Sequence, residues 1–275
     1  LTKAKTTSEI KKAYRGLERI QQDMAALVSY EEKIKDIEEF ILVNEDATNW
    51  LQELETASID LFFTDPPYGI SVHENAIGIG SQTNGEFTTT GTTYDDSETN
   101  AKTLLNKLAV ESYRITKAFG HAYIFCGKTH FEWLRSIMES AGWLVFPWPI
   151  IWAKRETGQN NNPDKWPSAA YEAILFARKV DSCIILQGRA DWLQCDPVLP
   201  SLRLHQAEKP IPLCKELISR VCIPGAYVVD CCMGSGAIIE AAVDLKCFAL
   251  GCEKELSSYS LAVSRMTRWK ENNKR

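Results

Sequence analysis

The sequence predicts an α/β fold with a doubly wound, mostly parallel sheet. Short apolar runs that are typical of buried strands alternate along the chain with segments of helical periodicity. Two of these runs, 59–64 and 227–230, reach an aspartate at a tight turn. Open α/β sheets place their ligands beyond the carboxyl ends of their strands. We therefore expect the functional site at this edge of the sheet.

The expected elements follow from periodicity, length and breaker residues. Strands are expected at 40–43, 59–64, 122–126, 143–152, 171–176, 227–230 and 248–253, where apolar residues run between polar turns. Helices are expected at 48–54, 104–118, 131–139, 209–220, 236–244 and 255–269, where apolar residues recur at helical spacing. Pro147 and Pro149 interrupt the strand region at 143–152.

Three stretches depart from this alternation. Residues 1–40 show apolar residues at helical spacing, which predicts a helical extension or linker before the main domain at 41–275. A dimerisation arm, or the tail of an upstream domain, is the alternative. Residues 69–100 are rich in glycine and threonine, which predicts either a flexible loop that closes over substrate or a surface insertion. The irregular stretch at 180–204 is the candidate target-recognition segment.

The composition is that of a globular protein. The chain has 275 residues, of which 45% are hydrophobic, enough for a sizeable core. The formal net charge of −5 disfavours non-specific coating of nucleic acid but is compatible with a local basic groove. No membrane span or signal peptide is recognisable. The 9 cysteines lack zinc spacing, so we expect reduced thiols, a cytoplasmic location and no metal site.

The first motif is Asp65-Pro66-Pro67-Tyr68, which follows the strand expected at 59–64. The two prolines end that strand, because proline fixes φ and has no N–H to donate to a ladder. The turn offers the Asp65 carboxylate, the Pro66 carbonyl and the ring of Tyr68. Two acceptors and an aromatic face suit a planar ring that bears an amine. An ordinary strand-ending turn with a core tyrosine is the alternative for this tetrapeptide alone.

The second motif is a glycine turn after the strand at 227–230. Gly234 and Gly236 allow the backbone to approach a ligand closely, and the helix that follows presents free N–H groups. The next strand ends at Glu253, about 20 residues on, where a carboxylate binds ribose hydroxyls in nucleotide-binding folds. These features predict a nucleoside-like pocket. The full dinucleotide spacing and the Walker lysine are both absent, which disfavours a nucleoside triphosphate.

Seven motifs occur in a fixed order between residues 40 and 268. They are Asn44-Glu45-Asp46, Asp65-Pro66-Pro67-Tyr68, Trp152-Ala153-Lys154, Tyr171-Glu172-Ala173-Ile174-Leu175, His205 with Lys209-Pro210, Asp230 to Gly236, and Gly251-Cys252-Glu253. Together they resemble the amino-methyltransferases of DNA that use S-adenosylmethionine. The position of the Asp65 motif before the glycine motif is similar to the permuted, β-class order. Cys231-Cys232 replaces the Pro-Phe of the family motif, and Ala237 replaces its usual threonine.

The resemblance implies a Rossmann-like methyltransferase domain at 41–275, with S-adenosylmethionine as cofactor and DNA as partner. An aspartate at the head of the box implies N6-adenine as the target. The implied catalytic residues are Asp65, Pro66 and Tyr68. The implied substrate-binding residues are Pro67, Tyr68, Lys154 and Arg155. The implied cofactor-binding residues are Asp46, Asp65, His205, Lys209, Asp230, Gly234, Ser235, Gly236 and Glu253.

The chemistry expected of this family is direct methyl transfer to an exocyclic amine. The Asp65 carboxylate and the Pro66 carbonyl would accept from the amine, favour a pyramidal nitrogen and so stabilise the transition state. In duplex DNA the base must first be flipped out of the stack. Candidate DNA contacts are Lys154, Arg155, Lys165, Arg178, Lys179, Arg189 and Arg203, with Trp166 and Trp192 for stacking or wedging. Each of these is otherwise an ordinary surface charge or core aromatic.

Other functions remain open at this point. One group comprises N4-cytosine methylation, RNA adenine methylation and methylation of a protein glutamine amide. Another is a non-catalytic subunit that binds DNA or a sister methyltransferase. A homodimer or partner subunit is expected from the resemblance alone.

Overall fold

The computed structural model of the chain describes residues 38–67, 98–154, 164–165, 167–180, 182–199, 201–205 and 207–273, with isolated positions between 21 and 32. The expected helical extension at 1–40 lies almost wholly outside the described residues, as does most of the expected loop at 69–100. Tyr68, Arg155 and Trp166 also lie outside them.

The strands are β1 (Phe40–Val43), β2 (Ile59–Thr64), β3 (Thr116–Cys126), β4 (Leu144–Val145), β5 (Ile150–Ala153), β6 (Tyr171–Arg178), β7 (Trp192–Gln194), β8 (Tyr227–Asp230) and β9 (Phe248–Cys252). The helices are α2 (Ala47–Glu53), α3 (Glu98–Ile115), α4 (Phe131–Ser140), α5 (Ile211–Val221), α6 (Ala237–Asp244) and α7 (Leu256–Asn273), with a short 3₁₀ helix, η1 (Lys128–His130).

The strands form one sheet in the order β1-β9-β8-β2-β3-β6-β5-β7, with β4 paired to β6. Strands β1, β9, β8, β2 and β3 are parallel to one another, whereas β6 runs antiparallel to β3, β4 and β5. The chain proceeds outward from β2 to β3 and from β8 to β9, in opposite directions along the sheet. The boundary between β2 and β8 is therefore the topological switch point, where such folds bind ligands. The predicted mixed α/β fold with a mostly parallel sheet is confirmed.

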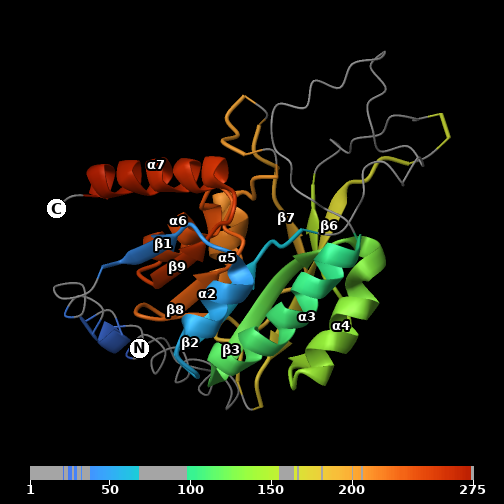
Figure 1. Ribbon diagram of the computed structural model, residues 1–275, viewed down its shortest axis with the longest axis horizontal. Coiled ribbons are helices and arrows are strands. Elements are labelled where there is room, and N and C mark those ends of the chain that lie inside the picture. The colour runs from blue at the N-terminus through green and yellow to red at the C-terminus, as the bar shows by residue number, and fades with distance from the viewer. Residues whose placement is uncertain are drawn as a thin grey trace, which may run out of the picture.

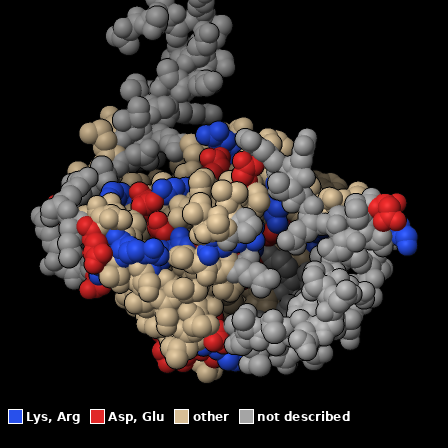
Figure 2. Space-filling view, turned by 90° about the horizontal axis from the view of Figure 1, so that it is seen from above, with Lys and Arg blue, Asp and Glu red and all other residues tan. Residues whose placement is uncertain are grey.

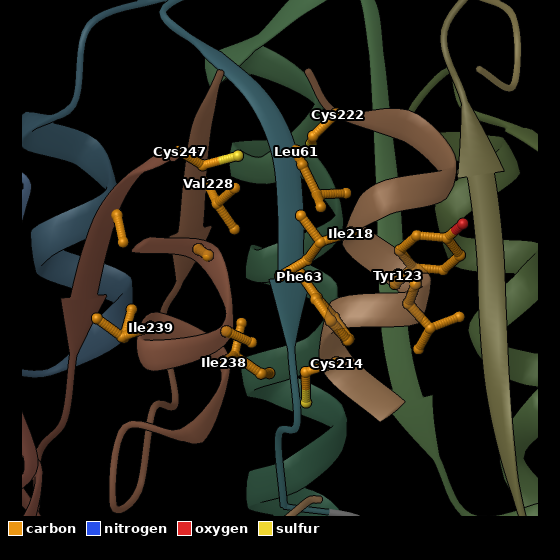
Figure 3. Packing of buried hydrophobic residues seen from close by; sticks show 14 of the residues in the cluster. Leu61, Phe63, Tyr123, Cys214, Ile218, Cys222, Val228, Ile238, Ile239 and Cys247 are labelled. Atoms are coloured by element: carbon orange, nitrogen blue, oxygen red, sulfur yellow. The ribbon is translucent and has the colours of Figure 1, made fainter. Parts of the chain in front are cut away.

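Helices cover both faces of the sheet (Figure 1). In β2, Leu61 and Phe63 belong to the cluster that contains residues of α5, α6 and α7, whereas Phe62 belongs to the cluster that contains residues of α2, α3 and α4. Figure 3 shows Leu61 and Phe63 near Ile218 of α5. Since alternate residues of one strand enter two separate cores, a continuous apolar run is what a central parallel strand requires.

Several element boundaries differ from the sequence-based expectation. The helix expected to reach residue 118 ends at Ile115, and β3 begins at Thr116 rather than at 122. Thr116 is fully buried and β-branched, which favours a strand. The irregular stretch at 180–204 contains β7, which was not predicted. Only Leu193 of its three residues is buried, so periodicity could not reveal it. The expected strand at 143–152 is divided into β4 and β5.

None of the nine cysteines, all of which lie in the described residues, forms a disulfide. Among the described helices, none combines the length and the apolar character needed to cross a lipid bilayer.

We expect Gly120→Ala to destabilise the protein. A register shift between Ile59 and Leu61 occurs where β2 pairs with β3, and Gly120 faces this irregularity. A Cβ at Gly120 would lie 2.8 Å from the backbone oxygen of Asp60 and would clash with the side chain of Thr116. Overpacking of this kind costs about 1–3 kcal/mol.

Urea unfolding of the Gly120→Ala variant measures this loss. Phe119→Ala is the control, because the neighbouring Phe119 side chain is 71% exposed. Equal stabilities of the two variants would contradict the prediction.

Candidate active site at the switch point

The carboxyl ends of four parallel strands meet at one edge of the sheet. Asp65 follows β2, Asp230 ends β8, Glu253 follows β9 and Asp46 follows β1. The hydroxyl of Thr64, the last residue of β2, donates to Asp230 Oδ1 at 2.8 Å across the switch point. The two motifs singled out from the sequence are therefore joined by a hydrogen bond. The site combines carboxylates from segments that are far apart along the chain.

The Asp65 carboxylate lies beside the ammonium group of Lys209. Lys209 Nζ is 2.5 Å from Asp65 Oδ2 and 3.3 Å from Glu172 Oε2. Glu172 Oε1 is in turn 2.5 Å from Lys154 Nζ. Burial opposes the charge of Lys209, but Asp65 and Glu172 raise the pKa of its ammonium group above the ordinary value. Burial also opposes ionisation of Glu172, but Lys209 and Lys154 lower the pKa of its carboxyl group below the ordinary value.

The glycine turn lies directly against Glu253. The N–H of Gly234 donates to Glu253 Oε2 at 2.9 Å, and the N–H of Glu255 donates to Glu253 Oε1 at 2.8 Å. The carboxylate is therefore held in one orientation at the tip of β9. The turn itself is closed by a bond of 2.8 Å from the N–H of Gly236 to the carbonyl of Met233. Gly234 and Gly236 both have positive φ, at 51° and 83°, which explains the need for glycine.

The space beside Gly234 fits a bound ligand. A Cβ built on Gly234 would have His205 Nδ1, at 3.9 Å, as its only neighbour within 4 Å among the described residues. A Cβ on Gly236, in contrast, would lie 3.2 Å from Cβ of Ala262. Within the described part of the chain, Gly234 thus faces an open region bordered by His205, whereas Gly236 packs against α7. Ser235 is buried. These residues match what a nucleoside with a charged tail needs: close backbone approach and a fixed carboxylate.

Asp46 serves as the N-cap of α2. Its Oδ1 accepts from the N–H of Thr48 at 3.0 Å and from the hydroxyl of Thr48 at 2.7 Å. Its Oδ2 pairs with Lys254 Nζ at 3.0 Å. Asn44 Nδ2 donates to the backbone oxygen of Glu253 at 2.8 Å. The loop after β1 is thereby attached to the end of β9, next to the carboxylate of Glu253.

A buried ion cluster positions the turn that contains His205. Glu208 Oε2 accepts from the N–H of Leu204 at 2.7 Å and from the N–H of His205 at 3.4 Å. Its other oxygen pairs with Arg265 of α7, and Arg265 also pairs with Glu240 of α6 at 2.8 Å. The side chains of Glu208 and Arg265 are 5% and 8% exposed. This cluster joins the His205 turn to the helix that follows the glycine turn.

The two cysteines that replace Pro-Phe of the family motif pack in or against the core. Cys231 is buried, and its Sγ lies 3.5 Å from Oγ1 of Thr64. The Sγ atoms of Cys231 and Cys232 are 4.0 Å apart. The N–H of Cys232 donates to Asp230 Oδ1 at 3.1 Å, an interaction that does not depend on the side chain at this position.

Asp230 is a buried internal acceptor. It is 1% exposed, and both of the bonds described above go to its Oδ1. Burial raises the pKa of the Asp230 carboxyl group to about 8, and the nearby Asp65 and Glu253 act in the same direction. Asp230 is therefore a connection between β8, β2 and the glycine turn.

The predicted DNA-contacting residues that the structure describes do not gather in one place. Arg178 pairs in the sheet with His121, and Lys179 donates to the carbonyl of Thr116 at 2.6 Å, both at the edge opposite Asp65. Their position follows from the antiparallel direction of β6, which carries Arg178 away from the Asp65 edge. Trp192 lies in the edge strand β7. Seen from above, the molecule shows basic and acidic groups interspersed rather than a uniformly basic face (Figure 2).

The other basic candidates are distributed as follows. Lys154 lies at the Asp65 edge, where its ammonium group pairs with Glu172. Lys165 is exposed. Arg189 lies 3.6 Å from Glu216 of α5, and Arg203 donates to the carbonyl of Val198 at 2.7 Å.

The sequence matches the family model described as DNA methylase, N6_N4_Mtase, over residues 59–184 and 185–264. The chain belongs to the N6/N4 DNA methylase family. Members of this family depend on S-adenosylmethionine, which is thus the cofactor that family membership assigns to the chain. No curated protein sequence matches the chain significantly.

Solved structures share the fold of this DNA methylase. The complex of M1.HpyAVI with S-adenosylmethionine has a TM-score of 0.62 at 20% identity and covers 82% of this chain and 98% of its own. The cytosine-N4-specific PvuII DNA methyltransferase has a TM-score of 0.62 at 14% identity, covering 82% and 86%. A protein from Thermus thermophilus, assigned as a DNA modification methylase and solved with S-adenosyl-L-methionine, has a TM-score of 0.60 at 21% identity, covering 82% and 93%.

Sequence reasoning missed four residues that build this site of the DNA methylase. Thr64 joins the two motifs, Glu172 pairs with both Lys209 and Lys154, and Glu208 and Arg265 form the buried cluster. Glu172 lies within the motif Tyr171 to Leu175. A charged residue at the start of an apolar strand could have indicated its role in the site. Arg265 lies on a helix with many other polar residues, and nothing in its local sequence marks it as buried.

We expect the stability of the methylase to fall between about pH 4 and about pH 8 because of Asp230. An aspartate in the unfolded chain has a pKa of about 3.9, so it loses its proton where the native carboxyl group, with a pKa of about 8, still keeps it. The unfolded state then binds fewer protons, and stability decreases as pH rises. Asp230→Asn keeps the Oδ1 acceptor and removes this ionisation.

Thermal unfolding at several pH values between 5 and 9 measures the difference between Asp230→Asn and the wild type. The melting temperature of the variant minus that of the wild type should increase with rising pH, by about 4 °C or more in total. A difference that stays constant with pH would show that Asp230 ionises normally in the native protein.

We expect Arg265→Met to destabilise the methylase strongly. It leaves Glu208 buried without its cation, and breaking one side of a buried pair costs about 3–5 kcal/mol. Adding Glu208→Gln should recover part of that loss. Chemical denaturation of the two variants measures it, with Arg135→Met, at a partly exposed arginine on α4, as the control. If Arg265→Met were as stable as the wild type, the buried ion cluster would not contribute to the stability of the native state.

Proposed function

We propose that this DNA methylase transfers the methyl group of S-adenosylmethionine to the exocyclic N6 amine of adenine in DNA. The observation that carries the proposal is the position of Asp65: an intact Asp-Pro-Pro-Tyr box begins at the switch point, beside the glycine turn and Glu253. Within the family that the sequence resembles, aspartate at the head of this box accompanies adenine, and N4-cytosine enzymes usually have serine there.

The reacting amine needs acceptors, and the Asp65 turn supplies them. The adenine amine is a poor nucleophile because its lone pair is delocalised into the ring. Acceptance of its two N–H bonds by the Asp65 carboxylate and the Pro66 carbonyl favours a pyramidal nitrogen with an available lone pair. A carboxylate has about four acceptor positions, so Asp65 can bind Lys209 and an amine at the same time. No cysteine is needed as a nucleophile.

The cofactor side of the site is assigned to the glycine turn and the strand tips. S-adenosylmethionine supplies an electrophilic methyl group on a sulfonium centre. Glu253, held by the N–H groups of Gly234 and Glu255, would accept from the ribose hydroxyls. Gly234 offers the open face described above. His205 and Lys209 would lie towards the methionine end.

Four further residues complete the proposed cofactor pocket. Asp46 would lie near the adenine ring, at the end of β1. Asp230 shapes the pocket from behind, because its described bonds go to Thr64 and Cys232. Ser235, buried within the glycine turn, supports its backbone. Gly236 allows the start of α6 to pack against Ala262.

The substrate side depends on base flipping. A target base inside a duplex must leave the stack, at a cost of a few kcal/mol, before its amine can reach Asp65. Stacking on an aromatic ring offsets part of that cost, by about 1–3 kcal/mol. Tyr68 has this role in the proposal, with Pro67 beside it and with Lys154 and Arg155 towards the phosphates. The target-recognition segment at 180–204, the loop at 69–100 and a homodimer stay predictions.

Methyl-labelled S-adenosylmethionine and unmodified DNA test the proposal. The DNA is digested after incubation, and the labelled nucleoside is identified. We expect N6-methyladenine with the wild type and a loss of about 100-fold or more in rate with Asp65→Ala, as for removal of one key transition-state acceptor or donor. Glu55→Ala, at an exposed glutamate just before the amino end of β2, is the control and should keep its activity.

The other outcomes are informative. Label in N4-methylcytosine would keep methyl transfer to DNA and overturn the choice of base; the similarity in fold to the cytosine-N4-specific PvuII enzyme makes this the second candidate. Label in RNA alone would exclude DNA as the substrate. Absence of label together with absence of cofactor binding by calorimetry would refute the proposed activity in favour of a non-catalytic subunit.

A further inference from the structure

Four side chains of alternating charge extend from the Asp65 turn into the antiparallel part of the sheet. We call Asp65, Lys209, Glu172 and Lys154 the charge chain. Successive members lie 2.5, 3.3 and 2.5 Å apart between their charged atoms. Their side chains are between 7% and 23% exposed. The charge chain contains two positive and two negative groups, and each of them has an opposite charge beside it.

The sheet sets the position of Glu172. Glu172 is the second residue of β6 and pairs with Trp152 of β5. Lys154 follows β5. Its ammonium group lies 4.7 Å from the ring centre of Trp152 and also pairs with the carboxylate of Glu172. Glu172 therefore has little freedom to move. Glu172 is a rigid anchor compared with Lys209, because Lys209 lies in the loop before α5 and has a longer, more flexible side chain.

Lys209 is located by groups from three different elements. Besides Asp65 and Glu172, its ammonium group lies 4.7 Å from the ring centre of Phe125 in β3. An ammonium group held by one carboxylate alone would draw electron density from that carboxylate and weaken it as an acceptor. A second carboxylate on the far side shares the positive charge.

We propose that Glu172 is a positioning residue for methyl transfer: it anchors Lys209 and shares its charge, so that the Asp65 carboxylate keeps both its orientation and its strength as an acceptor. This inference rests on the proposed function. Lys154 balances the charge of Glu172 and lets that carboxylate remain at a partly buried edge. The target amine then meets an Asp65 group that is fixed before substrate arrives.

A purely structural role explains the charge chain less well. Ion pairs that are largely removed from water seldom add net stability compared with apolar groups of similar size. Clusters of interacting titratable groups at a ligand edge are instead typical of functional sites. The charge chain also ends at the one residue of the Asp-Pro-Pro-Tyr box that carries a charge.

Steady-state kinetics of Glu172→Gln, with the full chain and unmodified DNA, tests the role. This change keeps the size of the side chain and removes its charge. We expect kcat to fall about 10-fold or more, while KM for S-adenosylmethionine changes by less than about 3-fold. Glu172→Asp should recover part of kcat. Glu216→Gln is the matched control, because Glu216 is likewise a partly buried carboxylate paired with a basic side chain, Arg220, but lies on α5 away from Asp65.

A second measurement does not depend on activity. In protein labelled with 13C at lysine Cε, the NMR signal of Lys209 is assigned by its loss in Lys209→Gln. We expect Glu172→Gln to shift this signal, whereas Glu216→Gln leaves it in place. Kinetics of the Glu172→Gln and Lys209→Gln double variant complete the test. If the two residues act as one unit, the double variant is about as slow as Lys209→Gln alone.

The possible failures are distinguishable. An active wild type whose kcat is unchanged by Glu172→Gln, or a Lys209 signal that does not shift, overturns the positioning role and leaves the proposed function intact. Losses of kcat that multiply in the double variant also overturn it. A wild type that binds S-adenosylmethionine but methylates no DNA refutes the proposed function, and with it any part of Glu172 in that reaction.

Discussion

The parallel pairing of β2 with β8 is the constraint on which the rest of the structure depends. These strands contribute the Asp65 turn and the glycine turn, and they are adjacent in the sheet although Thr64 and Asp230 are separated by 166 positions in the sequence. The hydrogen bond between these two residues closes the switch point. Glu253 and the loop of Asp46 are then added by β9 and β1, each in parallel register. A ligand-binding edge results from the order of strands alone.

Charge at this edge is balanced rather than uniformly basic. Asp65 and Glu172 share Lys209, Asp46 pairs with Lys254, and Glu208 with Arg265. A protein that acts on DNA must bring carboxylates close to a polyanion, and each unpaired carboxylate would add repulsion. Pairing within the protein reduces that repulsion without an overall positive charge. A formal net charge of −5 is thus compatible with a DNA substrate.

Much of the architecture was predictable from local patterns, because each central strand must bury both faces. Apolar runs such as 59–64 and glycines with positive φ have local causes, and the spacing between Gly234 and Glu253 reflects one strand–turn–helix–strand unit. The missed features have non-local causes. Arg265 is buried only because Glu208 arrives from another segment, and β7 is a strand only because β5 offers it an edge. Single-sequence reasoning has no access to such partners.

The separation between β2 and β8 also determines when the site comes into existence. Local units such as α3 with β3 involve neighbouring segments, so they can form while the chain is still being synthesised. The switch point cannot, since β8 and β9 belong to the last fifth of the sequence. Contacts between distant segments slow folding, because a long loop must be closed before the contact stabilises it. If the glycine turn binds the cofactor, as proposed, cofactor binding is a late event in the assembly of this methylase.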